Sequence, residues 1–387
     1  MQPLHKSKYF INTNNVFPSK VLSDPIYSPL DSNDILPFHE SLPNYKRTSL
    51  YTLKNLAKTL GVGTIYLKNE NERYGLNAFK ALGASYASVK MMTKEKEKNP
   101  NAKLALCTAT DGNHGRAVAW TARITGATAT IFVPHFTKEE RIENIKKEGA
   151  KVVISRGDYD VAVNDAYEES KKHNMIFVQD MGFEGYIDIP LLIMAGYTTV
   201  FNEVIQVVKD FDIVFLQAGV GSFASAMIYA ILKQHAQDSS FKKPKIVVVE
   251  PYEVDCCMES IKEDTCVKSK GKGETIMAGL NCMTPSSLAI PIIKYGCDLL
   301  LAVDDFYAVK AMNMLYRPEG KDVQVVAGES GAGGMAGLIA LMTEPELQEA
   351  KESIGIGRES KVLVVSTEGD TDKESFRKLV IDNADYA

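Results

Sequence analysis

Lys80 is the first side chain whose type and surroundings point to chemistry, in the stretch YGLNAFKALGASY from Tyr74 to Tyr86. A segment with helical character begins directly after it. Two interpretations are open: the lysine is an ordinary solvated residue at a helix start, or it is a buried amine held ready to form a Schiff base. The second requires desolvation or a neighbouring cation to lower the pKa of the amine, because only the neutral form attacks a carbonyl.

A glycine-rich turn, AGVGSFASAM at residues 218–227, follows an apolar segment and opens a predicted helix. It can bind a phosphate, because its glycines let backbone N–H groups approach an anion and the helix start adds partial positive charge. The residues of this phosphate cup are Gly219, Val220, Gly221, Ser222 and Phe223, of which Ser222 adds a hydroxyl. A tight turn without a ligand is an equally good interpretation of the turn alone, since neither a Walker lysine nor a third glycine follows.

A second turn, ATDGNHGRAV at residues 109–118, also lies between an apolar segment and a predicted helix. Asn113 can hydrogen-bond a hydroxyl or an oxyanion of a ligand, and the amides around Gly112 can face a carboxylate. The alternative is structural: Asp111 is a helix N-cap and His114 an ordinary helix residue whose hydrogen bonds are satisfied.

A late pair of hydroxyls, Ser366 and Thr367 in STEGDTD, is suited to a heterocyclic ring nitrogen. A Schiff-base lysine, a phosphate cup, an amide for a phenolic oxygen and a hydroxyl for a ring nitrogen are together what pyridoxal phosphate requires. Each signal is weak alone, but the four reinforce one another.

Four motifs carry a resemblance to a known family: NAFK at 77–80, DGNHG at 111–115, GVGSF at 219–223 and STEGDTD at 366–372. Together they resemble the fold-type II pyridoxal-phosphate enzymes, the tryptophan-synthase β-like group, over residues 51–372. GLNAFK, ATDGNHGR, FEGY and STEGDTD are most similar to the ammonia-lyases of that group that act on 2,3-diaminopropionate. The resemblance implies an α/β fold of two mainly parallel sheets and a homodimer.

The resemblance also implies site roles. Lys80 would bind pyridoxal phosphate covalently, Asn113 would hold its phenolic oxygen, the phosphate cup would hold its phosphate, and Ser366 is preferred to Thr367 at the ring nitrogen. The substrate carboxylate would lie on the turn formed by Thr110, Asp111, Gly112, Asn113 and His114. Glu329, in AGESGAGG, either lies near the cofactor or is a structural acid outside it.

Asp111 and Asp180 are the acidic pair that the resemblance implies for substrate and catalysis. Fixed negative charge favours a substrate with a β-ammonium group over serine, which has a hydroxyl there. Lys80 would remove the α-proton of the L-enantiomer and Asp111 that of the D-enantiomer, and elimination would give pyruvate and two ammonia.

Two alternatives remain. One is a serine or threonine dehydratase-like or racemising enzyme on the same fold, although relatives of that kind carry a small residue at the position of Asp111. Their terminal S-G-G-N also becomes Ser366-Thr367-Glu368-Gly369 here. The other is a small-molecule binding protein that has kept the fold without catalysis.

Apolar, β-branched segments alternate with helical segments along most of the chain, which indicates parallel sheets covered by helices. Strands are expected at 64–69, 103–108, 129–134, 151–155, 175–180, 212–218, 245–251 and 361–367, and helices at 114–126, 138–150, 160–174 and 222–236. The second of these helices should end at a Gly149 cap. We expect a large domain of residues 1–103 and 191–387, and a small domain of residues 104–190.

The chain has 387 residues and a formal net charge of -5, without a basic stripe, so nucleic acid is not expected as a partner. No signal-peptide core and no run of roughly 18 apolar residues is present, so we expect a cytoplasmic protein without a membrane partner. Six cysteines show no C-x-x-C spacing, and no metal is expected. A bond from Cys256 or Cys257 to Cys282 is the minority interpretation. Residues 268–275 are the candidate mobile loop, and residues 268–277 a candidate lid.

Overall fold

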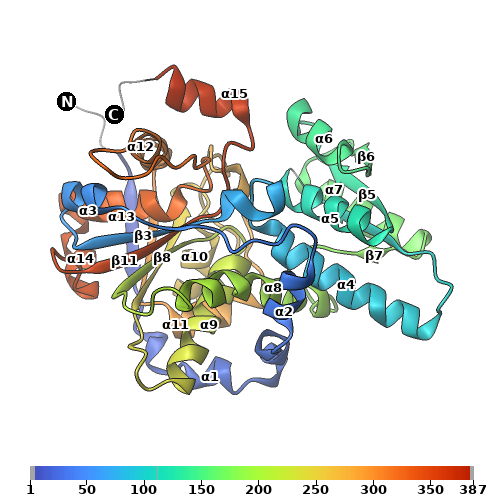
Figure 1. Cartoon of the computed structure of the whole chain (residues 1–387), viewed down its shortest axis with the longest axis horizontal. Coiled ribbons are helices and arrows are strands. Elements are labelled where there is room, and N and C mark those ends of the chain that lie inside the picture. Colours follow the sequence, from blue (N-terminus) through green and yellow to red (C-terminus); the bar gives the residue numbers. More distant parts are fainter. Residues whose placement is uncertain (1–4, 111, 384–387) are drawn as a thin grey trace.

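The computed structural model describes residues 5–110 and 112–383, and its larger layer is a seven-stranded sheet (Figure 1). The strand order is β1-β10-β9-β8-β11-β3-β2. The two edge strands, β1 and β2, are antiparallel to their neighbours, and the other pairs are parallel. The strands are β1 (Ser7–Ile11), β2 (Leu50–Thr52), β3 (Thr64–Asn69), β8 (Ile213–Gln217), β9 (Lys245–Pro251), β10 (Leu299–Val303) and β11 (Lys361–Ser366).

The second sheet is smaller and wholly parallel, with the order β6-β5-β4-β7. Its strands are β4 (Ala105–Ala109), β5 (Thr128–Val133), β6 (Lys151–Ile154) and β7 (Ile176–Phe177). The predicted α/β class with two mainly parallel sheets is confirmed. All four strands lie inside the predicted small domain of residues 104–190, whose boundaries stay a prediction.

Helices cover both faces of the large sheet, because successive strand side chains point to opposite sides. Ile213 and Phe215 belong to one apolar cluster, whereas Val214 and Leu216 belong to the other. On the first face lie α3 (Lys54–Leu60), α12 (Asp305–Tyr316), α13 (Gly333–Thr343) and α14 (Gln348–Ile354). On the second lie α4 (Lys80–Lys98), α8 (Asp188–Ile205), α9 (Ser222–Gln237) and α11 (Ala289–Gly296).

The second sheet lies between α5 (Asn113–Thr125) on one side and α7 (Tyr159–Lys172) on the other, and α6 (Glu139–Lys146) packs against α5 and β6. The long helix α4 packs against both α8 and α5, so it joins the two layers. Shorter helices complete the chain: α1 (Ser19–Leu22), α2 (Ile35–Ser41), α10 (Cys256–Lys262) and α15 (Lys373–Phe376). In Figure 1 the second sheet and its helices lie to the right of the large sheet.

Three strands were absent from the sequence prediction: β1, β2 and β10. β1 and β2 are short antiparallel edges whose residues are mostly half-buried, so they lack the apolar run of a central parallel strand. The helix predicted to reach residue 150 ends at Lys146, although Gly149 does adopt a positive φ of 90°.

The predicted mobile loop is anchored in the structure. Ser269 donates to Asp255 at 2.7 Å, and the backbone N–H of Lys272 donates to Glu253 at 3.0 Å. At the far end Thr275 and Ile276 both donate to the carboxylate of Asp305. The mobility of this segment stays a prediction, but its ends are fixed.

Candidate active site

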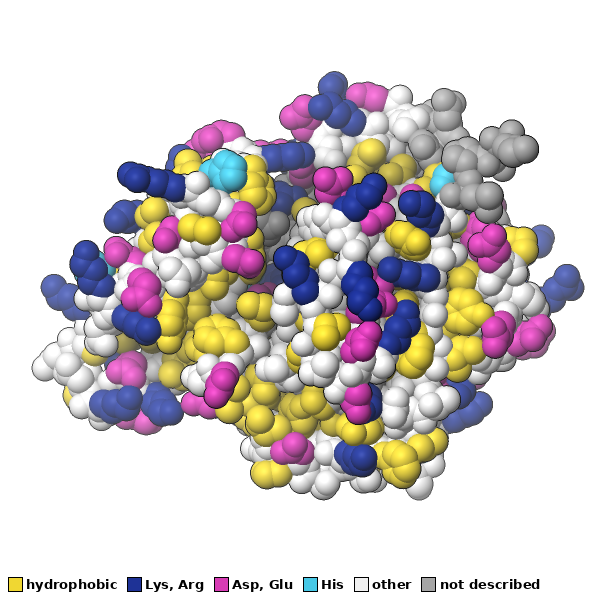
Figure 2. Space-filling view, turned by 180° about the vertical axis from the view of Figure 1, so that it is seen from behind, with side chains coloured by type: hydrophobic (Ala, Val, Ile, Leu, Met, Phe, Trp, Pro, Cys, Tyr) yellow, Lys and Arg dark blue, Asp and Glu magenta, His cyan; other side chains and the backbone are white. Residues whose placement is uncertain are grey.

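A cavity of about 540 Å³ lies beyond the carboxyl ends of β8 and β11 in the large sheet and of β4 in the second sheet. This is where open parallel sheets bind ligands. On the face shown in Figure 2 the molecule is hollowed between a smaller lobe and the larger body. The predicted site residues that line the cavity are Lys80, Thr110, Gly112, Asn113, His114, Asp180, Gly219, Val220, Gly221, Ser222, Phe223 and Thr367. Asp111 lies outside the described residues.

The segment that carries Lys80 pairs with the terminal STEGDTD segment. Ala78 forms a β-bridge with Glu368, and the N–H of Phe79 donates to the carbonyl of Thr367 at 3.1 Å. Asn77 has a positive φ of 63° and is held by Asp370 at 2.9 Å. Two motifs that are far apart in the sequence therefore fix the start of α4.

Lys80 is a mostly buried amine and not a solvated surface charge. Its side chain is 20% exposed, and its Nζ lies 2.6 Å from Oδ2 of Asp180. Burial alone would lower the pKa of Lys80, but the neighbouring Asp180 carboxylate raises it well above its usual value. The expectation of a depressed pKa is therefore wrong for this arrangement, because the carboxylate outweighs desolvation.

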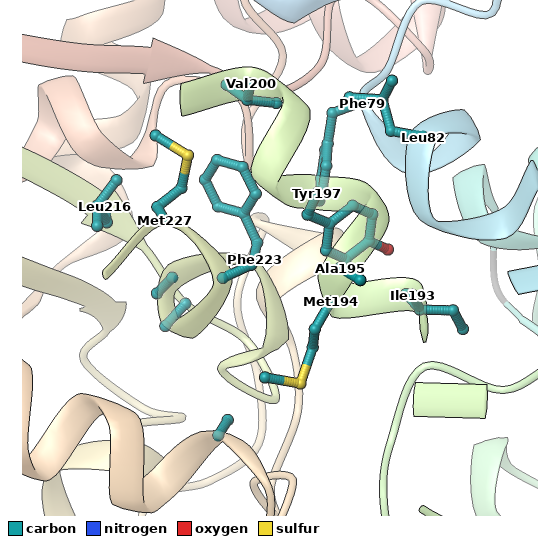
Figure 3. Close-up of a cluster of buried hydrophobic side chains, with 14 of the residues drawn as sticks. Phe79, Leu82, Ile193, Met194, Ala195, Tyr197, Val200, Leu216, Phe223 and Met227 are labelled. Carbon is teal, nitrogen blue, oxygen red and sulfur yellow. The ribbon is translucent and has the colours of Figure 1, made fainter. Parts of the chain in front are cut away.

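Aromatic rings pack around the base of Lys80. Phe79 lies between Tyr197 and Phe223, with ring centroids 4.7 Å and 4.6 Å away (Figure 3). The hydroxyl of Tyr197 is buried and has no hydrogen-bond partner among the described residues. Burial raises the pKa of this hydroxyl, and the neighbouring Lys80 amine opposes the rise.

Asp180 and His114 form the acidic side of the cavity. Nε2 of His114 lies 2.8 Å from the carbonyl of Val178, so it carries the proton and Nδ1 is an acceptor. Burial lowers the pKa of His114, which keeps the ring neutral. Nδ1 is buried without a partner among the described residues and lies 4.0 Å from Oδ2 of Asp180. Two acceptors so close favour a ligand with an ammonium group.

The turn after β4 differs from the expectation in one respect. The N–H of Gly112 donates to Oγ1 of Thr110 at 3.0 Å, so this amide is already bonded within the turn. The N–H groups at the start of α5, from Asn113 onward, have no carbonyl to bond inside the helix. These amides, and not that of Gly112, are available to a carboxylate.

The phosphate cup lies at the start of α9. Gly221 has a positive φ of 92°, and a Cβ there would lie 3.0 Å from the Cβ of Ala289. A Cβ on Gly219 would lie 3.1 Å from the Cα of Leu280, so both positions need glycine. Ser222 Oγ donates to the carbonyl of Asp180 at 2.9 Å. The hydroxyl expected at the phosphate is therefore bonded to the backbone of Asp180.

The amide of Asn113 is engaged by an acid that the sequence motifs had not assigned. Asn113 Nδ2 donates to Oε2 of Glu368, which also lines the cavity. Glu368 Oε1 accepts the N–H of Ser330 at 3.2 Å. Burial, together with the nearby Glu329, raises the pKa of Glu368. Glu329 itself does not line the cavity and accepts from Ser375 at 2.5 Å, which favours the structural interpretation.

Of the late hydroxyl pair, Thr367 lines the cavity and Ser366 does not. Ser366 is the last residue of β11, and its Oγ donates a hydrogen bond to the carbonyl of Glu368 at 3.5 Å. Thr367 Oγ1 accepts from Nε2 of Gln217 at 3.0 Å. The geometry therefore favours Thr367 over the expected Ser366, because neighbouring residues at a strand end point to opposite sides. Which of the two contacts a ring nitrogen stays a prediction.

No disulfide bond joins the cysteines of the described residues, so a bond from Cys256 or Cys257 to Cys282 is not supported. The thiols of Cys256 and Cys257 instead donate to the carbonyl of Gly219, at 3.5 and 3.6 Å. Glu250, Cys256 and Cys257 bring ligating atoms within 4.8 Å of one another, but Glu250 already accepts two backbone N–H groups at the start of α10. The absence of a metal stays a prediction.

Sequence reasoning missed several cavity residues, including Gln217, Glu368 and Tyr159. Gln217 ends an otherwise apolar strand, which is a signal that could have been used. Tyr159 gave no signal, because it reaches the cavity only through the packing of α7 on the second sheet.

The residues fit pyridoxal phosphate. The cavity combines a glycine-lined helix start for an anion, a buried lysine, an amide and a threonine hydroxyl. Gln217 Oε1 and His114 Nδ1, both on cavity-lining residues, are buried polar atoms without a partner among the described residues. A polar ligand would give such atoms the partners that buried groups normally have.

Comparisons with known proteins agree with this arrangement. A family model described as pyridoxal-phosphate dependent enzyme matches residues 42–367. A diaminopropionate ammonia-lyase of Salmonella typhimurium is 35% identical over an alignment of 402 residues, which covers 96% of this chain and 97% of that protein. A crystal structure of the Escherichia coli diaminopropionate ammonia lyase, in complex with an aminoacrylate-PLP azomethine reaction intermediate, has a TM-score of 0.86 and 31% identity, covering 98% of this chain and 97% of that one. An L-threonine ammonia-lyase of Thermotoga maritima is 26% identical over 294 residues, which covers 76% of this chain and 67% of that protein.

Proposed function

The chain belongs to the family of pyridoxal-phosphate-dependent enzymes, and we propose that it catalyses the α,β-elimination of 2,3-diaminopropionate, in both enantiomers, to pyruvate and two ammonia. One water is consumed. The observation that carries the proposal is the group formed by Lys80, Asp180 and His114. The Lys80 amine lies 2.6 Å from Oδ2 of Asp180, and the unpartnered Nδ1 of His114 lies 4.0 Å from the same oxygen. The similarity to diaminopropionate ammonia-lyases supports the same substrate.

The cofactor would be held by residues that line the cavity. Lys80 would bind its aldehyde carbon, and the amides at the start of α9 would bind its phosphate. Asn113 would donate to its phenolic oxygen and Thr367 would face its ring nitrogen. Because a hydroxyl at the ring nitrogen is neutral, it does not force protonation of the ring. When bound, pyridoxal phosphate supplies the electron sink that allows the Cα–H bond of the substrate to break.

The chain's own residues handle the protons. Lys80 Nζ takes the α-proton of the L-enantiomer, and Asp180 at 2.6 Å stabilises the ammonium that results. The β-ammonium departs as ammonia with the electron pair of the C–N bond, so it needs no further proton. The released 2-aminoacrylate takes up water to give pyruvate and the second ammonia.

Asp180 and His114 would recognise the β-ammonium group. Burial acts to raise the pKa of Asp180, but the neighbouring Lys80 amine lowers it to about 2, so Asp180 is ionised. His114 Nδ1 offers a neutral acceptor beside it. A serine hydroxyl would donate only one hydrogen to this pair and would leave the charge of Asp180 unmatched, which is the physical reason to prefer an ammonium substrate.

The test is pyruvate release from D- and L-diaminopropionate and from L-serine. We expect both diaminopropionate enantiomers to react well and serine poorly, Lys80→Ala to release no pyruvate, and Asp111→Asn to lose the D-activity selectively. Glu374→Gln, which removes an exposed charge, is the control. A preference for serine would instead identify a dehydratase. A colourless protein whose absorbance is unchanged by Lys80→Ala would identify a binding protein.

We also propose that the enzyme is a cytoplasmic homodimer. No helix among the described residues is long and apolar enough to span a membrane. Several large apolar side chains are exposed, including Val16 at 67% and Phe17 at 53%, and a second subunit would cover such groups. Light scattering after gel filtration tests the oligomer: a monomer mass at micromolar concentration would contradict it.

A further inference from the structure

Glu368 has the contacts of a residue that orients another side chain. It is 7% exposed and lies at the cavity beside Asn113. One carboxylate oxygen accepts from Asn113 Nδ2 and from Thr371 Oγ1 at 3.4 Å, and the other accepts the N–H of Ser330 at 3.2 Å. Bonds from both sides therefore fix the direction of the carboxylate.

The backbone of Glu368 is fixed as firmly as its side chain. The carbonyl of Glu368 accepts the N–H of Gly328 at 3.0 Å, and Glu368 forms the β-bridge with Ala78. A Cβ on Gly331 would lie 2.1 Å from the same carbonyl oxygen, so only glycine permits the loop to approach. The carboxylate thus stands on a rigid segment that also holds the start of α4.

An ionised Glu368 permits only one orientation of the Asn113 side-chain amide. If the amide of Asn113 turned by 180°, its oxygen would face an oxygen of Glu368, and two acceptors would repel. The nitrogen is therefore held on the side of Glu368. An amide nitrogen carries two hydrogens, so one is bonded to Glu368 and the second is left for a ligand acceptor.

We propose that Glu368 is a positioning residue that orients the Asn113 amide so that one N–H is presented to the phenolic oxygen of the cofactor. The inference rests on the proposed contact between Asn113 and pyridoxal phosphate. Glu368 acts through Asn113 and takes no part in the proton transfers assigned to Lys80.

The experiment compares the holoenzyme with Glu368→Gln, Asn113→Ala and the double variant. Two quantities are measured: the dissociation constant of pyridoxal phosphate, and the pH at which the visible absorbance of the bound cofactor titrates. Glutamine can accept or donate, so Glu368→Gln leaves the amide of Asn113 free to turn. We expect Glu368→Gln to weaken cofactor binding about tenfold, as for one lost hydrogen bond, and to shift the titration.

The double variant separates positioning from a general effect on stability. If Glu368 acts through Asn113, the double variant binds the cofactor no more weakly than Asn113→Ala. Additive losses would overturn the proposal, as would a Glu368→Gln protein with unchanged affinity and titration. Glu374→Gln serves as the charge control and should match the unaltered enzyme.

Two further outcomes are distinguishable. If Glu368→Gln fails to fold, Glu368→Asp carries the test, because it keeps the charge and withdraws the carboxylate by one methylene. It should shift the titration less than Asn113→Ala does, and an unshifted titration would overturn the proposal. If the unaltered enzyme shows no lysine-dependent absorbance, the proposed function fails, and with it the premise of this inference.

Discussion

Lys80 and Asp180 are 100 residues apart in the chain, yet their charged atoms lie 2.6 Å apart in the cavity. Each partner changes the other: Asp180 raises the pKa of Lys80, and Lys80 helps to lower that of Asp180 to about 2. When the amine is free, Asp180 therefore holds Lys80 as an ammonium in a mostly buried position. A counterion, and not desolvation alone, sets the protonation of this lysine, whose covalent role stays a proposal.

The free energy of unfolding at acidic pH tests the ion pair of Lys80 and Asp180. The ordinary pKa of Asp180 is 3.8, and the folded value of about 2 is lower. The carboxylate therefore contributes stability that is present above about pH 4 and is lost as the pH falls through about 2. This contribution is about 2 kcal/mol by linkage.

The prediction is that Asp180→Asn flattens the fall in unfolding free energy between pH 4 and pH 2. Denaturant unfolding at a series of pH values, on enzyme freed of cofactor so that the Lys80 amine can pair, measures it. Glu374→Gln should keep the original slope. An unchanged slope in Asp180→Asn would show that the two groups do not interact in solution.

At the scale of elements, the contact between α4 and α8 positions Lys80. Two glycines allow the helices to approach: a Cβ on Gly83 would lie 2.5 Å from the ring of Tyr197, and one on Gly196 would lie 2.5 Å from the carbonyl oxygen of Leu82. The second clash is with backbone, which cannot turn aside as a side chain can.

Gly196→Ala should therefore push α8 away from the start of α4. We expect a loss of about 2 kcal/mol in unfolding free energy and a weaker retention of the cofactor, since Lys80 is the first residue of α4. Thermal unfolding and cofactor titration measure the two effects. Gly357→Ala is the matched control, because nothing lies within 4 Å of a Cβ there. Equal stability of the two variants would refute the close-contact argument.

At the scale of the whole molecule, an ion pair joins the second sheet to the C-terminal segment. Lys138, the N-cap residue of α6, donates to Asp372, the N-cap residue of α15. Burial acts to raise the pKa of Asp372, but the hydrogen bond from Lys138 opposes this, and the pKa is lowered. Arg141, three residues after Lys138, and Thr371, directly before Asp372, both line the cavity. The pair therefore joins the two segments that carry these lining residues.

Lys138→Met should raise the KM for the substrate several-fold while kcat and stability change little. The side chain of Lys138 is 60% exposed, so the pair contributes less than about 1 kcal/mol to stability. Steady-state kinetics at low and high salt measure the effect, and high salt should raise the KM of the unaltered enzyme toward that of the variant. Lys146→Met is the control, since Lys146 pairs only with acids of its own helix among the described residues. A KM unchanged by Lys138→Met would argue against a role of this ion pair in substrate binding.

The local sequence determined the alternation of strands and helices and the turns that carry Asn113 and the phosphate cup, because apolar periodicity and glycine placement are local properties. Through motifs that resemble a family, it also led to the expectation that Lys80 and the late hydroxyl pair, Ser366 and Thr367, bind one cofactor. It did not reveal β1 and β2, which are short edges without a full apolar run.

Only the tertiary structure decided how those side chains meet. The pairing of residues 77–79 with the terminal segment, the bond between Asn113 and Glu368, and the ion pair of Lys80 with Asp180 all join positions far apart in the chain. The direction of the backbone at the end of a strand decides which side a residue faces, so that Thr367 lines the cavity and Ser366 does not. Charge interactions depend on distance and burial, and neither is a property of sequence spacing.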